Sequence, residues 1–131
     1  MDKFLEIDGV RLHYADTGKS DGKPIIIMHG YGCNINTVAS IAAILEPGMR
    51  VINIDLPGHG KSDEPPYIWG VNDYTVCIER LIEKLELKHV SLLGHSFGGR
   101  IGILLSSRNN DINKLVLVDA AGIKPKRSLK Y

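Results

Sequence analysis

Cysteine is scarce in this sequence, with only Cys33 and Cys77 among 131 residues. The two do not form a Cys-X-X-Cys pair, and two isolated cysteines do not make the framework of a disulfide-stapled domain. The histidine, cysteine and carboxylate residues also lack the spacing of a metal site, so we expect no bound metal. We interpret both cysteines as small packing residues in a reducing compartment and predict that the protein is cytoplasmic.

An excess of either charge sign is also missing, because 16 Lys and Arg against 15 Asp and Glu leave a formal charge of +1. This balance argues against nucleic acid or an anionic membrane as the main partner. The first six residues, Met-Asp-Lys-Phe-Leu-Glu, lack the apolar core of a secretion signal. No apolar run approaches the ~20 residues that span a bilayer. We therefore expect one soluble domain that binds neither nucleic acid nor membrane.

What is present is an alternation of strand and helix patterns. Residues 4–8 and 10–15 alternate in polarity around Asp8-Gly9, which predicts a hairpin. Apolar runs without alternation predict strands buried on both faces of a parallel sheet, at residues 25–28, 51–55, 90–93 and 115–118. Apolar spacing predicts helices at residues 36–45, from an Asp73 N-cap to residue 87, and at 96–107.

This order predicts an α/β fold: a mostly parallel sheet with an N-terminal antiparallel hairpin and helices on both faces. In such sheets, sites lie at the carboxyl ends of the strands. Three unusual loops leave from those ends, at residues 29–32, 56–62 and 94–98. We therefore expect these three loops to converge on one site.

Residues 94–98 read Gly-His-Ser-Phe-Gly and connect a predicted strand to a predicted helix. This pattern is typical of a nucleophile elbow, in which small residues two before and two after the serine let strand and helix approach. Ser96 is therefore the candidate nucleophile, although the same residues could form a helix cap without chemistry. Attack on an ester or amide by Ser96 needs a base and an oxyanion hole. We assign the oxyanion donors to the backbone N–H groups of Phe97 and Tyr31.

Four segments together resemble the α/β-hydrolase superfamily, most closely its cofactor-free esterase and carbon–carbon-bond hydrolase branch. They read His-Gly-Tyr-Gly at residues 29–32, Asp-Leu-Pro-Gly-His-Gly-Lys-Ser at 55–62, Gly-His-Ser-Phe-Gly-Gly at 94–99 and Leu-Val-Leu-Val-Asp at 115–119. The resemblance implies the same roles for Ser96, Phe97 and Tyr31, and a structural role for Asp55. It also implies a reaction without a cofactor.

In the family, the catalytic acid and the histidine usually follow later strands, which are absent here. The resemblance therefore implies that residues 1–123 are the N-terminal part of the core domain and that 124–131 form a basic tail or the start of a linker to a cap. Within the chain, His59 is a possible base and Asp119 is a possible triad acid. We expect structural roles for His29 and His95. We expect His13 and His89 to lie at the end of the sheet away from the site.

The function predicted from this resemblance is a serine hydrolase that cleaves a carboxylic ester through an acyl-enzyme on Ser96, with a small ester-like molecule as substrate. The 131-residue chain alone is expected to be inactive because it lacks an assigned base. One alternative is a carbon–carbon-bond hydrolase or cofactor-free peroxidase that uses the same site. Another is a non-catalytic or partner-dependent chain that self-associates through an open sheet edge at residues 115–118.

Overall fold

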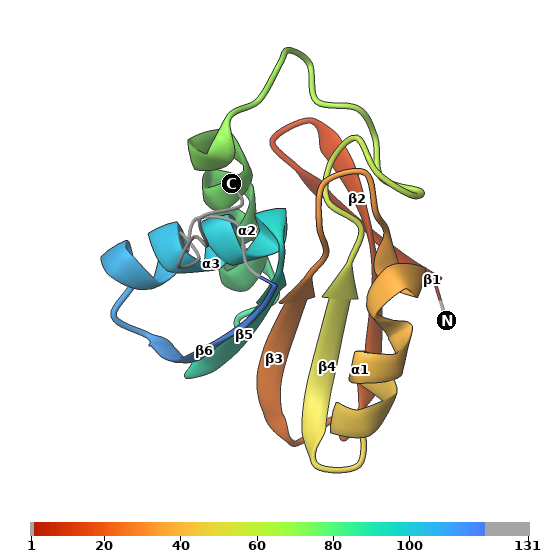
Figure 1. Cartoon of the computed structure of the whole chain (residues 1–131), viewed down its shortest axis with the longest axis vertical. Helices are drawn as coiled ribbons and strands as arrows, with labels where there is room; N and C mark the ends of the chain where they lie inside the picture. The colour runs from red at the N-terminus through yellow and green to blue at the C-terminus, as the bar shows by residue number, and fades with distance from the viewer. Residues whose placement is uncertain (1, 120–131) are drawn as a thin grey trace, which may run out of the picture.

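The computed structural model describes residues 2–119, which form six strands, three α-helices and one 3₁₀ helix (Figure 1). In chain order they are β1 (Asp2–Ile7), β2 (Val10–Gly18), β3 (Lys23–Met28), η1 (Ile35–Val38), α1 (Ala39–Leu45), β4 (Met49–Ile54), α2 (Val71–Lys84), β5 (Val90–His95), α3 (Phe97–Arg108) and β6 (Ile112–Val118). The predicted tail at 124–131 and the domain boundary at residue 123 lie outside the described residues.

The strands form one sheet in the order β1-β2-β4-β3-β5-β6. The first two make the predicted hairpin, and both turn residues have the positive φ of a two-residue hairpin turn, 48° at Asp8 and 85° at Gly9. β2 then runs antiparallel to β4, whereas β3 is parallel to both β4 and β5, and β5 is parallel to β6. The predicted α/β fold with an N-terminal hairpin is confirmed.

Helices cover both faces of this sheet, with α1 on one side and α2 and α3 on the other (Figure 1). The middle of β3 shows why its sequence has no polar alternation: Ile26 packs in the larger core with α2 and α3, whereas Ile25 and Ile27 pack in the smaller core with α1. All three side chains are at most 3% exposed. The central strands are therefore buried on both faces, as predicted.

Two local predictions are wrong. Asp73 is not the N-cap of α2, because the helix begins at Val71 and Gly70 is its cap. The Asp73 carboxylate instead accepts a hydrogen bond from the Gly70 N–H at 2.9 Å and so caps the helix from inside its first turn. The β6 strand is only half-buried, and its Val116 is 44% exposed. Among the described strands β6 pairs with β5 alone, so solvent reaches it as it would an edge strand.

In the part of the chain that the structure describes, every helix is too short or too polar to cross a membrane. The predicted cytoplasmic location stays a prediction.

Candidate active site

Ser96 occupies the turn between β5 and α3 in a backbone conformation that L-residues rarely adopt, with φ 55° and ψ −116°. Such conformations cost about 1–3 kcal/mol and persist where the surrounding structure enforces them. Here the Ser96 N–H donates to the Val118 carbonyl oxygen of β6 at 3.0 Å. The side chain is half-buried at the carboxyl end of β5. The predicted strand-turn-helix geometry around Ser96 is thus present.

Two glycines allow this turn because they lack a Cβ, which lets the backbones of α3, β3 and β5 come close together. A Cβ on Gly94 would lie 2.5 Å from the Gly98 carbonyl oxygen, inside van der Waals contact. A Cβ on Gly98 would collide with the Met28 carbonyl at the end of β3. The first turn of α3 therefore sits directly against the ends of β3 and β5, and it is this packing that fixes Ser96 at the sheet edge.

The loop after β3 lies against the serine. A Cβ on Gly30 would be 3.1 Å from the Ser96 Cβ and 3.5 Å from the Ser96 Oγ. The next residue, Tyr31, has a side chain that is 72% exposed, and its ring meets the Phe97 ring edge to face at 5.8 Å between centroids. The structure therefore brings together the three residues to which the sequence assigns a nucleophile and two backbone donors.

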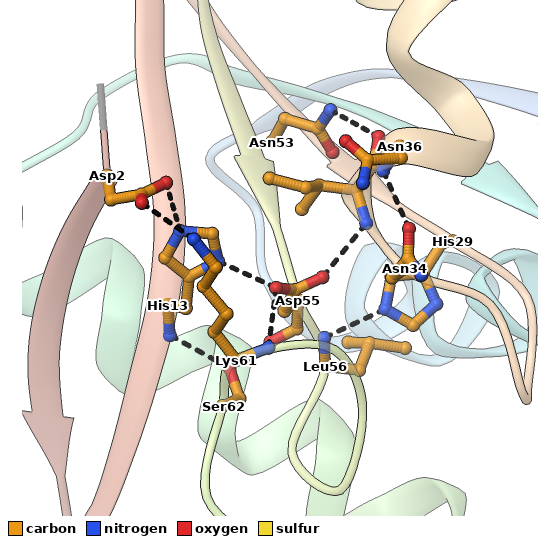
Figure 2. A network of polar contacts seen from close by, with 11 residues as sticks. Asp2, His13, His29, Asn34, Asn36, Asn53, Asp55, Leu56, Lys61 and Ser62 are labelled. Atoms are coloured by element: carbon orange, nitrogen blue, oxygen red, sulfur yellow. Dashed lines mark hydrogen bonds and ion pairs between the residues drawn. The ribbon is translucent and has the colours of Figure 1, made fainter.

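Behind these loops lies a buried carboxylate, Asp55, which follows the end of β4 and is 2% exposed (Figure 2). Its Oδ1 accepts a hydrogen bond from the Ile35 N–H at 2.9 Å. Its Oδ2 accepts from the Lys61 N–H at 3.0 Å and lies 2.6 Å from His13 Nδ1. Asp55 thus ties the loop after β3 to the loop after β4, with β2 as a third anchor.

The predicted position of His13 is wrong: it lies next to Asp55, at the site end of the sheet. The reason is that β2 is antiparallel to β4, so that His13 lies beside the carboxyl end of β4, where its carbonyl accepts from the Asp55 N–H at 2.9 Å. The other ring nitrogen of His13, Nε2, is 2.8 Å from Asp2 Oδ1 (Figure 2). The buried His13 ring thus lies between two carboxylates, Asp55 after β4 and Asp2 on β1.

Asp2 links β1 to the same cluster. Its second oxygen, Oδ2, accepts from Lys61 Nζ at 2.8 Å. Hydrogen bonds from Lys61 and then from His13 lower the pKa of the Asp2 carboxyl to about 2. Asp2 therefore remains ionised throughout the physiological range.

Two further histidines hold the loops in place as neutral rings. His29 is fully buried, accepts at Nε2 from the Leu56 N–H at 2.9 Å and donates from Nδ1 to the Gly30 carbonyl at 2.7 Å. Burial lowers the pKa of His29, which keeps the ring uncharged. His59 accepts at Nε2 from the Gly32 N–H at 2.8 Å, and its Nδ1 lies 3.1 Å from the Pro57 carbonyl, to which it donates. The structural role expected for His29 fits these contacts.

The hydrogen bonds of the histidines bear on which of them could act as the base for Ser96. Both ring nitrogens of His59 are engaged within its own loop and with Gly32, so in this arrangement the ring has no nitrogen free to take a proton from Ser96. His95 is half-buried, and its Nδ1 is covered and has no hydrogen-bond partner. His89 lies at the opposite end of β5, as predicted, with an 81% exposed side chain paired with Asp111.

The possible acid Asp119 directly follows β6, and it is exposed with φ 45°. Its neighbour Val118 is the residue that accepts the Ser96 N–H. Asp119 therefore lies at the same sheet edge as the serine, one strand away. Its assignment as a triad acid, like that of His59 as a base, stays a prediction.

Comparison with known proteins places this geometry in a family. A family model described as the α/β-hydrolase fold matches residues 23–130. The chain belongs to this family. A serine hydrolase-like protein from Danio rerio is 32% identical over 111 residues, which cover 82% of this chain and 34% of that protein. The α/β-hydrolase segment here thus spans about a third of that relative's length.

Solved α/β-hydrolase structures superpose closely on the chain. An esterase from Exiguobacterium antarcticum has a TM-score of 0.82 at 32% identity, covering 92% of this chain and 46% of the esterase. A membrane phospholipase A, described as a bacterial virulence factor, has a TM-score of 0.91 at 25% identity, covering 98% and 42% respectively. The resemblance drawn from the four sequence motifs is confirmed for the family and the fold.

Proposed function

We propose that this chain carries the nucleophile part of a serine hydrolase active site that cleaves carboxylic esters of small molecules. The observation that carries the proposal is the conformation of Ser96, with φ 55° at the carboxyl end of β5 and Gly30 packed against its side chain. A strained serine at a strand-to-helix turn is the arrangement of a nucleophile elbow. The names of the relatives, a serine hydrolase-like protein and an esterase among them, agree with this chemistry.

In this proposal, the Ser96 oxygen attacks the ester carbonyl and gives up its proton to a base. The N–H of Phe97 is the first of α3 and has no partner inside the helix, so it is free to stabilise the oxyanion with the Tyr31 N–H. Collapse of the intermediate releases the alcohol, which takes up the proton, and leaves an acyl group on Ser96. Water then attacks the acyl group, releases the carboxylic acid and returns the proton to Ser96.

In this proposal the base lies outside the described residues, and the engagement of both ring nitrogens of His29 and of His59 in holding loops supports this. The Danio rerio relative is about three times as long as the matched segment, so we propose that the base belongs to a longer polypeptide. The 131-residue chain by itself is then inactive. A cytoplasmic location and the lack of nucleic-acid or membrane partners remain part of the proposal.

A steady-state assay with p-nitrophenyl acetate tests the function in the natural polypeptide. Ser96→Ala is expected to lower kcat/KM by roughly a thousandfold or more, because the nucleophile is lost. Ser107→Ala removes an exposed serine from the same helix and should leave kcat/KM unchanged. Unchanged hydrolysis by Ser96→Ala would refute the proposal. Turnover of a vinylogous diketone in place of simple esters would favour the carbon–carbon-bond hydrolase.

A second candidate function, self-association of the 131-residue chain, is favoured by the half-exposed β6 strand with Val116 at 44% exposure. Size-exclusion chromatography of this chain tests it. Dimers or larger oligomers are expected, and a monomer at all concentrations would contradict it.

A further inference from the structure

A row of aromatic rings runs from the residue after the candidate nucleophile out to the proline-rich loop at residues 63–70. Phe97 meets Tyr31 and Tyr74 edge to face, at 5.8 and 5.3 Å between centroids. Tyr74 meets Trp69 in the same way at 5.2 Å, and Trp69 lies 6.4 Å from Tyr67. Two loops and two helices, α2 and α3, thus contribute to one aromatic wall beside the site.

The wall borders a hollow of about 600 Å³, which we call the aromatic hollow. Its lining includes Tyr31, Tyr67, Trp69 and Tyr74 together with one carboxylate, Glu64. Tyr31 and Tyr67 are 72% and 62% exposed, so both rings are open to solvent and available to a ligand. The Trp69 Nε1 is covered, so the part of this ring that reaches the hollow is carbon.

The residues that line the hollow include a single charged side chain, a carboxylate. Of its thirteen lining residues none is Lys or Arg, and Glu64 is the one acid. His59 also lines it, and its hydrogen bonds are those of a neutral ring. Lys61 lines an adjoining hollow of about 150 Å³, which shares Asn34 and Gly60 with the aromatic hollow, and its Nζ contacts the Asp2 carboxylate at 2.8 Å. Burial and then the neighbouring Tyr31 and Glu64 raise the pKa of Tyr74, so its ring stays neutral as well.

Aromatic faces attract cations through their quadrupole, and cages of such rings recognise quaternary ammonium groups. A carboxylate at the rim adds a net attraction for a cation and repels an anion. We propose that the aromatic hollow binds an alkylammonium group, so that the preferred substrates carry a positive charge near the ester. The identity of these molecules as substrates rests on the proposed function, whereas their binding in the hollow does not.

The chain contains a natural reporter, because Trp69 is its only tryptophan. The experiment titrates choline into the chain and follows Trp69 fluorescence. The comparison ligand is 3,3-dimethyl-1-butanol, which has the shape of choline without the charge. Choline is expected to bind about twofold to fivefold more tightly than the neutral alcohol, as for a cation–π contact at an exposed site. Isothermal titration with the same two ligands provides a second measurement that does not depend on fluorescence.

Variants separate charge from shape. Glu64 is exposed, so Glu64→Gln is expected to weaken choline binding by about 1.5-fold to fivefold and to leave the neutral alcohol unaffected. Glu6→Gln changes an exposed carboxylate on the edge strand β1 and serves as the matched control, with no expected effect. Tyr67→Leu keeps an apolar side chain but removes the ring, and is expected to weaken choline more than the alcohol.

Equal binding of choline and the neutral alcohol would overturn the proposal in favour of a simple apolar surface, and so would a lack of choline binding. The Ser96→Ala variant distinguishes this outcome from a failure of the proposed function. Choline binding should survive in Ser96→Ala, because the hollow does not use the hydroxyl. If choline binds but Ser96→Ala does not impair ester hydrolysis, the proposed function is wrong and the ammonium site stands.

Discussion

Asp55 should be the polar residue whose loss most destabilises the site loops. Asp55→Ala removes the acceptor for two backbone N–H groups, those of Ile35 and Lys61, and for the buried His13 ring. Leaving a buried donor without its acceptor costs about 1–3 kcal/mol for each group. Since domains of this size have a free energy of unfolding of about 5–15 kcal/mol, the loss is a large part of the total. Urea unfolding followed by circular dichroism measures it.

Asp55→Asn is the milder test, because it keeps the shape of the side chain and one acceptor oxygen. Its amide N–H₂ must then face one of the three donors, so we expect a loss of about 1–3 kcal/mol. Asp21→Asn changes an exposed acid in the turn before β3 and should change the free energy of unfolding by less than about 0.5 kcal/mol. Equal urea midpoints for Asp55→Ala and Asp21→Asn would refute the conclusion that Asp55 holds the loops after β3 and β4 together.

Three further predictions concern other residues. Gly98→Ala should destabilise the chain by about 1–3 kcal/mol in the same assay, because its Cβ meets the Met28 carbonyl; a wild-type urea midpoint would contradict that contact. Because burial lowers the pKa of His29, its share of the stability is complete above the ordinary value of 6.5 and is lost as pH falls below it. The urea midpoint should therefore drop between about pH 7.5 and 5.5, and by less in His29→Gln; parallel curves would contradict this. Iodoacetamide should modify the half-buried Cys33 first, since burial raises the pKa of Cys77 to about 12; equal rates for the two thiols by peptide mapping would contradict the burial.

The fold could be predicted from the sequence because the local sequence patterns agree with the long-range packing. The apolar run of β3 predicts burial on two faces, and Ile26 and Ile27 do face separate cores. Asp8-Gly9 predicts a tight hairpin turn, and both residues have positive φ. In such cases one short segment contains the whole reason for its conformation, so that the pattern alone is enough.

The contacts that sequence patterns missed are those set by strand order. No local sequence pattern predicts whether the hairpin pairs with β3 or with β4. The pairing of β2 with β4 is what places His13 beside Asp55. The aromatic wall was missed for a related reason, since Tyr67 and Trp69 belong to a loop without a repeating geometry. Charged and aromatic residues clustered in that loop were the available signal, but only the folded chain shows which rings meet.

The most direct test of the central claim is to label the natural polypeptide with a fluorophosphonate and identify the modified peptide by mass spectrometry. The account predicts a single adduct on Ser96, lost in Ser96→Ala and kept in Ser107→Ala, with little labelling of the isolated 131-residue chain. An adduct on another residue, or none in the natural polypeptide, would contradict the assignment of Ser96 as the nucleophile. Stoichiometric labelling of the isolated chain would instead show that a base lies within it, and His59 would then be the first residue to replace.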